Sequence, residues 1–321
     1  MSSLRAAADY AASIAAALGG AYRSGAWWRC RCPVHGGMSA TLALRDGARG
    51  LIVRCFAGCT SARILAELHR RGLYIGEMGE ARAPDPEAER RRSEAEAAER
   101  RRRIALARDM WRSALPAEET IVARYLCHRL PRLAAIPPAI RYLPPGSPYA
   151  RHPEGAGWPV MLAGVQRIGE PGIVAVTRTW IAMDGRAKAS LRPLRKFTGP
   201  VAGGAVRLAP AGATLIVAEG VETTLAAMTA ASLSGWAALS AGGIERLILP
   251  PIVRTVIIAA DHDSNGIGER AARIAERKWL AEGRRVRIFM SPRAGEDAAD
   301  LLAAQAQDAW VDAAMGARHA A

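Results

Sequence analysis

The distribution of apolar residues changes along the chain, and the change is sharpest after residue 213. From there on, short apolar runs alternate with stretches of helical periodicity, and the connections between them are short. The expected strands are 214–220, 235–240, 255–261 and 284–290, and the expected helices are 221–232, 266–283 and 298–316. The run TVIIAA is apolar and does not alternate with polar residues, which is typical of a strand covered on both faces. This rhythm predicts an α/β fold in which a parallel sheet lies between two layers of helices.

The pattern of apolar and polar residues also divides the rest of the chain into three further parts. Residues 1–78 combine an Ala-rich helix with short strand-like runs and a second helix. Residues 79–116 have a charged helical pattern in which Glu often precedes Arg at helical spacing. This pattern favours a solvated linker helix, although a face that contacts phosphate groups is the alternative. Residues 117–210 predict a helix followed by short strands with Gly turns, and residues 211–321 form the α/β part.

The charge balance adds a property that the hydrophobic pattern does not show. The 321 residues include 44 Lys and Arg against 30 Asp and Glu, which gives a formal net charge of +14. Guanidinium groups suit phosphate, so a polyanionic partner is expected. No apolar run approaches the roughly 18 residues of a membrane span, and the N-terminus lacks the layout of a signal peptide. We therefore expect a cytoplasmic protein without membrane segments or structural disulfides.

Acidic residues follow two of the expected strands. Glu219 comes after the run TLIVA, and Asp261 and Asp263 come after TVIIAA. Side chains two residues apart in extended backbone point the same way, so Asp261 and Asp263 would repel each other unless a cation lay between them. Carboxyl ends of parallel strands share one edge of a sheet, so Glu219 would join them if the two strands are neighbours. A hard divalent ion such as Mg²⁺ would bind such oxygens, whereas polar turns and helix N-caps use the same residue types without a metal.

Four of the five cysteines lie between positions 30 and 59, together with one histidine. Cys32 and His35 form one pair, and Cys55 and Cys59 form a second pair further along. Two turns that each present two soft or borderline ligands are what a tetrahedral zinc site requires, and the metal would supply folding energy to a small segment. Cys30 is near enough in sequence to compete as a ligand. The alternative is that the cysteines pack as small hydrophobic side chains.

Given these residues, the segment from about 213 to 302 resembles a Toprim domain, the catalytic fold of bacterial primases, type IA and type II topoisomerases and some nucleases. The family pattern is a Glu after the first strand and Asp-x-Asp after a later strand, matched here by Glu219 and by Asp261 and Asp263. The likeness is greatest to Toprim proteins of phages and mobile elements, through the motifs AEGVETTLA, ALSAGG, AADHDSNG and GEDAADLL.

The last of these motifs departs from the family pattern. It has Glu296 where Lys is common and Ala299 where Asn is common. Asp297 or Asp300 in this motif would complete the shell of the metal ion or cap the helix that follows. The departures bear on this accessory role and not on the central triad of carboxylates.

The resemblance implies chemistry on a nucleic-acid phosphodiester that depends on Mg²⁺ or Mn²⁺. The first hypothesis is a DNA primase-like nucleotidyltransferase of a phage or mobile element, which joins nucleoside triphosphates into short primers on single-stranded DNA. Asp261 and Asp263 would hold the metal, and Glu219 would bind metal or serve as general base. A Toprim-type nuclease is the second hypothesis. The third is a non-catalytic, zinc-containing accessory protein of replication that binds single-stranded DNA.

The cysteine segment resembles the CHC2-type zinc ribbon at the front of bacterial and phage primases, through CPVHGGMSATLAL and VRCFAGC. In that family the ribbon is thought to recognise single-stranded template. Carried over, this makes five residues candidate contacts for stacking and for phosphate, namely Trp27, Trp28, Arg29, Arg31 and Arg54. The alternative is that the Trp side chains cover the core of a very small domain and that the Arg side chains are solvated around them.

A basic stretch, LRPLRKFTGP, precedes the first strand of the Toprim-like segment and contains Arg192, Arg195 and Lys196. In primase-like enzymes the corresponding segment forms a basic wall of the catalytic cleft, so these residues are candidates for binding the nucleoside triphosphate or the template backbone. A solvated face is the alternative. The chain contains no G-x4-GK-[ST] loop, so any helicase partner is expected to be a separate protein.

Overall fold

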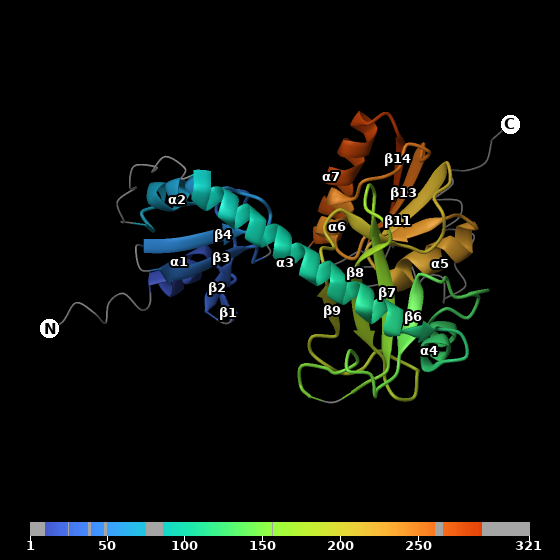
Figure 1. The fold of residues 1–321 in the computed structure, drawn as a ribbon. Coiled ribbons are helices and arrows are strands. Elements are labelled where there is room, and N and C mark those ends of the chain that lie inside the picture. The colour runs from blue at the N-terminus through green and yellow to red at the C-terminus, as the bar shows by residue number, and fades with distance from the viewer. Residues whose placement is uncertain are drawn as a thin grey trace. The chain divides into compact units, whose positions relative to one another are not determined.

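The chain forms two compact units, Met1–Arg91 and Arg92–Ala321. The computed structural model describes residues 10–24, 26–37, 40–47, 50–74, 86–155, 157–260 and 266–290. Helix α3 (Pro86–Ser113) begins in the first unit and ends in the second (Figure 1). Among the described residues, no helix combines the length and the apolar character needed to cross a membrane.

The first unit is a four-stranded antiparallel sheet with two helices. Its elements are α1 (Tyr10–Leu18), β1 (Tyr22–Ser24), β2 (Trp27–Cys30), β3 (Leu42–Gly47), β4 (Gly50–Cys55) and α2 (Ser61–Arg70), with the strands in the order β1-β2-β3-β4. In β4, exposed and buried residues alternate, as expected for a strand with one face on the core. Leu51 and Val53 on its buried face share one hydrophobic cluster with Ile14 of α1 and with Ile64 and Leu68 of α2.

The second unit contains one large mixed sheet. Its elements after α3 are β5 (Leu115–Pro116), α4 (Ile121–Arg129), β6 (Ile140–Leu143), β7 (Val160–Arg167), β8 (Ile173–Trp180), β9 (Arg195–Thr198), β10 (Gly204–Arg207), β11 (Thr214–Ala218), α5 (Val221–Ala231), β12 (Gly235–Ala237), α6 (Ala241–Arg246), β13 (Thr255–Ala260), α7 (Ile267–Ala281) and β14 (Arg285–Met290). The main path of the sheet has the order β14-β13-β11-β12-β10-β7-β6-β5, and β8 pairs with both β7 and β9. The pairs among β12, β11, β13 and β14 are parallel, and the remaining pairs are antiparallel.

Successive residues of the parallel strands belong to different cores, so these strands are covered on both faces. Val217 and Ile258 pack with α6 and α7, while Ile216 and Ile257 pack with α5. The same division continues across the antiparallel strands, where α4 shares a cluster with α5 and α3 packs with β7 and β8 in another. The predicted parallel sheet between two layers of helices is therefore confirmed (Figure 1).

The structure adds elements that the hydrophobic pattern did not reveal. Strand β9 lies within the basic stretch LRPLRKFTGP, and short helix α6 follows β12. The second half of α3 is part of a core, because Ala107 and Met110 are buried beside β7 and Arg108 donates hydrogen bonds to the carbonyl oxygens of Pro171 and Ile173. The expected helix at 298–316 lies outside the described residues. The division into four parts remains a prediction.

Candidate functional site

Strands β11 and β13 are parallel neighbours, and this places Glu219 at a defined edge of the sheet. Ala218, the last residue of β11, is in register with Ala259, and β13 ends one residue later at Ala260. Glu219 therefore follows its strand at the edge where β13 also ends. The other four candidate ligands of Mg²⁺, which are Asp261, Asp263, Asp297 and Asp300, lie outside the described residues.

The backbone of Glu219 is held from the loop after β12. The amide of Leu239 donates to the Glu219 carbonyl oxygen at 2.9 Å, and Leu239 adopts a left-handed conformation with φ of 71°. A leucine at positive φ costs free energy and persists only where its surroundings fix it. Its own carbonyl oxygen accepts a hydrogen bond from Arg195 Nη2 at 3.2 Å. Leu239 thus links the Glu219 backbone to a cation of the predicted basic stretch.

The glycines of the ALSAGG motif have a packing reason in this loop. A Cβ atom on Gly243 would lie only 1.9 Å from the carbonyl oxygen of Ala238, so no other residue fits there without moving the backbone. Ser240 is the N-cap of α6, and its hydroxyl accepts a hydrogen bond from the Gly243 amide at 2.9 Å. The motif therefore shapes the loop that holds Glu219.

A pocket of about 340 Å³ opens beside Glu219. It is lined by Arg129, Thr179, Lys188, Leu194, Arg195, Glu219, Gly220, Glu222 and Thr223. Three of these residues are cationic and two are acidic, so the pocket presents positive charge next to a candidate metal ligand. Of the three predicted basic residues, Arg195 lines the pocket, whereas Arg192 and Lys196 are exposed and are not among its lining residues.

A buried carboxylate, which the sequence reasoning did not single out as a site residue, forms one wall of this pocket. Glu222 Oε1 accepts a hydrogen bond from the Tyr125 hydroxyl at 3.0 Å and lies 3.0 Å from Lys188 Nζ. Burial alone would raise the pKa of Glu222, but the Lys188 ammonium and the Tyr125 hydroxyl hold it below its ordinary value. Glu222 stands in the quoted motif AEGVETTLA, so a signal was present, but its partners come from distant parts of the chain.

The four predicted zinc ligands lie together in the first unit. The Sγ atoms of Cys32, Cys55 and Cys59 and a ring nitrogen of His35 all lie within 4.8 Å of one another. Zinc–sulfur bonds of about 2.3 Å in a tetrahedron place ligand atoms roughly 3.8 Å apart, so this donor set fits zinc. His35 Nδ1 is 3.2 Å from Cys59 Sγ, and its Nε2 is 3.1 Å from the Thr41 hydroxyl. The second contact would orient the ring toward a metal.

Cys30 is not part of this cluster. It is fully buried in the hydrophobic core of the first unit. Burial raises the pKa of its thiol to about 12. Burial also raises the pKa of Cys32 to about 11, but Cys32 has the other ligands beside it, and a bound cation would favour its thiolate. Cys30 therefore packs as a small hydrophobic side chain, as one of the two alternatives expected.

A shallow hollow on the first unit combines aromatic and basic side chains. It is lined by Trp27, Arg29, Ala43, Arg54 and Phe56. Phe56 is 51% exposed, and the guanidinium groups of Arg29 and Arg54 lie 4.1 and 5.3 Å from its ring centre. Of the five residues predicted to contact nucleic acid, three line the hollow, namely Trp27, Arg29 and Arg54. Trp28 packs partly buried against the core, and Arg31 is not among the lining residues.

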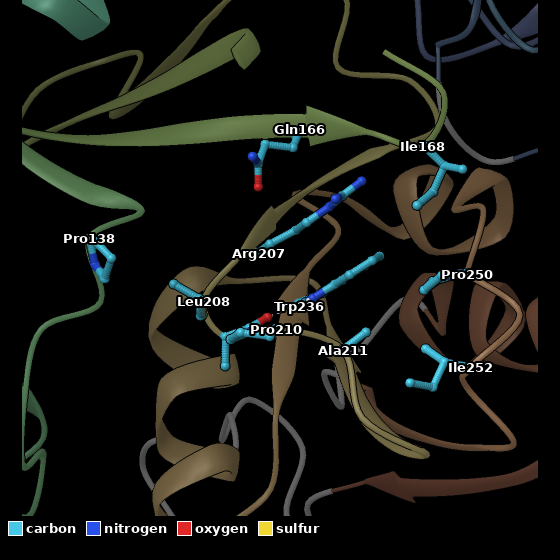
Figure 2. A pocket seen from close by; sticks show the side chains of 11 residues that line it. Pro138, Gln166, Ile168, Arg207, Leu208, Pro210, Ala211, Trp236, Pro250 and Ile252 are labelled. Atoms are coloured by element: carbon cyan, nitrogen blue, oxygen red, sulfur yellow. Dashed lines mark hydrogen bonds between the residues drawn. The ribbon is translucent and has the colours of Figure 1, made fainter. Parts of the chain in front are cut away.

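A larger pocket of about 510 Å³ lies on the other side of the Toprim-like segment, near the residues that precede β11 and β13. Figure 2 shows its lining, in which Pro210, Pro250 and Ile252 surround the ring of Trp236. The Arg207 guanidinium stacks on this ring at 4.6 Å. The pocket is mainly apolar and contains none of the predicted site residues, so the pocket beside Glu219 is the candidate active site.

Comparisons with known families divide the second unit in two. Residues 101–208 match a family described as a domain of unknown function (DUF7146), and residues 214–308 match the Toprim domain family. No curated protein matches the sequence.

Several solved primase structures are similar to parts of the chain. A DNA primase domain from Pseudomonas aeruginosa is 20% identical to this chain, with a TM-score of 0.35. The similarity covers 47% of this chain and 50% of the primase domain. The DnaG primase catalytic domain bound to ssDNA is 17% identical with a TM-score of 0.43, over 67% of this chain and 82% of that one. The Aquifex aeolicus primase, with zinc-binding and RNA polymerase domains, is 15% identical with a TM-score of 0.41, over 96% and 84%.

The match to the Toprim family includes the parallel strands β11 to β14 and the helices α5, α6 and α7, and its last residues lie outside the described part of the chain. The segment from 214 to 308 is therefore a Toprim domain.

Proposed function

We propose that this protein is a primase-like nucleotidyltransferase, which uses Mg²⁺ or Mn²⁺ to join nucleoside triphosphates into short primers on single-stranded DNA. The observation that carries the proposal is the position of Glu219. It lies where β11 and β13 end together, next to a pocket with three cationic residues. A carboxylate beside phosphate-binding cations is the arrangement that metal-assisted phosphoryl transfer requires.

Asp261 and Asp263 are the proposed main ligands of the metal, because they directly follow β13 in the sequence. Asp297 and Asp300 are proposed as further ligands. When bound, the divalent cation would supply positive charge that lowers the energy of the pentavalent phosphoryl transition state. Glu219 is proposed to share the metal or to accept the proton of the attacking 3′-hydroxyl group. Arg195 would orient the triphosphate, and Arg192 and Lys196 on the exposed side of the same stretch would contact the template backbone.

The first unit is proposed to hold zinc through Cys32, His35, Cys55 and Cys59 and to bind the single-stranded template. The hollow around Phe56 supports this part of the proposal, because an exposed ring flanked by guanidinium groups suits a stacked base and its phosphates. Trp28 is partly buried, so its proposed contribution is to hold the sheet that carries this hollow. A separate helicase would supply single-stranded template.

The test is a priming assay. The protein is incubated with single-stranded DNA of mixed sequence, labelled nucleotides and Mg²⁺ or Mn²⁺, and short labelled oligomers are expected. Degradation of the template in place of synthesis would favour a Toprim-type nuclease. DNA binding without either reaction, unchanged by Asp261→Ala, would favour a non-catalytic accessory role and overturn the proposal.

A further inference from the structure

The pocket beside Glu219 is lined by an ion pair between Glu222 and Lys188, and the carboxylate of this pair is buried. Glu222 is 9% exposed and lies near the start of α5, among the apolar side chains that join this helix to α4 and the sheet. Removing a carboxylate from water is unfavourable, and a buried ion pair is often no more stabilising than an apolar pair of the same size. A buried charge at the wall of a pocket therefore points to a role in that pocket.

The two partners of Glu222 come from different elements and meet on the same oxygen atom. Tyr125 on α4 donates to Oε1 at 3.0 Å, and Lys188, in the segment between β8 and β9, approaches Oε1 at 3.0 Å. Tyr125 is buried, whereas the Lys188 side chain is 41% exposed. The hydroxyl group thus fixes the carboxylate from the interior, and the carboxylate fixes the ammonium group at the surface of the pocket.

The ammonium group of Lys188 has three N–H donors, and the contact with Glu222 uses one of them. Among the described residues Glu222 is the one ion-pair partner of this ammonium group, so its other donors are available to a ligand in the pocket that Lys188 shares with Glu219 and Arg195. Glu222 is three positions after Glu219 in the chain, and Gly220 between them is the N-cap of α5. The first turn of α5 therefore carries Glu222, the partner of the Lys188 ammonium group, and Glu219 directly precedes the N-cap of the same helix.

Resting on the proposed function, we propose that Lys188 binds the phosphates of the incoming nucleotide and that Glu222, held by Tyr125, is the positioning residue that keeps Lys188 in place. In this assignment Glu222 acts through Lys188 and not as a metal ligand. Lysine is a flexible point charge, and a fixed counter-ion removes part of the entropy lost when it binds phosphate.

The direct test measures nucleotide binding without any reaction. The probes are Mg²⁺ with GTP, its non-hydrolysable β,γ-methylene analogue, and inorganic pyrophosphate, titrated calorimetrically into the full chain. Lys188→Met is expected to weaken binding of all three probes about 10-fold or more. Glu222→Gln and Tyr125→Phe are expected to weaken it less, because the ammonium group remains but is no longer held.

A double-substitution cycle separates positioning from a merely structural role. If Glu222 acts through Lys188, the double variant Lys188→Met with Glu222→Gln binds nucleotide no more weakly than Lys188→Met alone. Additive losses would overturn the positioning role. In the same variants, Mn²⁺ binding measured by electron paramagnetic resonance is expected to stay unchanged, whereas a loss in Glu222→Gln would make Glu222 a metal ligand and overturn the assignment.

The control is Lys278→Met. Lys278 is also held by acceptors of the second unit, the carbonyl oxygens of Glu245 and Leu247, but does not line the pocket. This substitution is expected to change thermal unfolding and to leave nucleotide binding as in the unsubstituted protein.

If the unsubstituted protein binds nucleotide through Lys188 but makes no primers, the proposed function fails and this inference stands. If primers are made and Lys188→Met binds nucleotide normally, the inference alone fails.

Discussion

The chemistry proposed for this protein depends on a few carboxylates that follow strand ends in the sequence. Glu219 is fixed through its own backbone by Leu239, and the strand that precedes Asp261 and Asp263 is in register with the strand that precedes Glu219. Such carboxylates contribute little to folding when they lie at a sheet edge, and their mutual repulsion opposes it. Substitution of these carboxylates should therefore abolish activity and leave the stability of the fold unchanged.

We expect Asp261→Ala and Asp263→Ala each to abolish primer synthesis, with a loss of at least about 1,000-fold, because a ligand of the catalytic metal is removed. The fold should remain intact. Synthesis is measured in the priming assay and stability by thermal unfolding. Asp184→Ala is the control, since Asp184 accepts a hydrogen bond only within its own turn, from the Arg186 amide. Unchanged synthesis in either variant would remove these residues from the active site.

Acid should weaken the second unit through Glu222. Its pKa in the folded state is below the ordinary value of 4.5, so the carboxylate contributes stability above pH 4.5 that is lost as the pH falls through the lowered pKa. Glu222→Gln removes this titration and should flatten the dependence of the unfolding free energy on pH in that acidic range. Denaturant unfolding of both proteins over a series of pH values measures the difference. Parallel curves would show that Glu222 has the same pKa in the folded and unfolded states.

At the scale of elements, we expect the first unit to need a metal to complete a small core. Its antiparallel strands end in turns that carry the Cys and His side chains, and Phe56 donates its amide to the carbonyl oxygen of Thr41 across the base of the cluster. Without a cation, three thiols and an imidazole must share one small volume, and the binding free energy of zinc is also folding free energy.

We expect about one zinc ion per chain, lost with Cys32→Ser or Cys55→Ser. Elemental analysis of protein purified without chelators measures the content, and circular dichroism of the variants should show loss of structure in the first unit. Cys30→Ala is the matched control, because Cys30 is buried outside the cluster and should leave the zinc content unchanged. If the purified protein contained no zinc, the predicted metal site of this unit would be wrong.

Thr41 should tune the affinity for this zinc ion without being a ligand. Its hydroxyl lies 3.1 Å from His35 Nε2, so Thr41→Val removes the contact that orients the ring and keeps the side-chain volume. Loss of such a contact typically weakens metal binding 10- to 100-fold, roughly the effect expected here. Competition with a chromogenic zinc chelator measures it. An unchanged affinity would mean that the ring is oriented by packing alone.

The exposed ring of Phe56 should matter for DNA and not for folding. Phe56→Ala is expected to weaken binding of single-stranded DNA roughly 10-fold, since one stacked base is worth about 1–3 kcal/mol. Fluorescence anisotropy with a labelled oligonucleotide measures it. Tyr22→Ala is the control, because Tyr22 is 53% exposed in the same unit but does not line the hollow. Equal losses in both variants would argue against a defined stacking site.

For the whole molecule, the net charge of +14 predicts binding to single strands that falls steeply with salt. Each neutralised phosphate should add about −0.7 to the slope of log affinity against log salt concentration. Replacing Arg192 and Lys196 by Gln together should reduce the magnitude of that slope by up to about 1.4 if both contact phosphates. Anisotropy titrations at several salt concentrations measure the slopes, and identical slopes would place both residues outside the DNA path.

The fold was predictable where one short segment carries the whole signal. Short apolar runs predicted the parallel strands, and the pairs Cys32 with His35 and Cys55 with Cys59 predicted the cluster of possible metal ligands. Contacts between distant segments were not predictable: Tyr125 and Glu222 are 97 positions apart. Trp27 and Trp28 illustrate a second limit, since neighbours in a strand face opposite ways and only the packed sheet shows which one lines the hollow.

Among the described strands, β11 and β13 are those with parallel partners along both edges. Their backbone amides are therefore expected to exchange with deuterium far more slowly than those of β9, which has a single partner. Glu219, which directly follows β11, would then keep its place at the end of its strand on the timescale on which β9 opens to solvent.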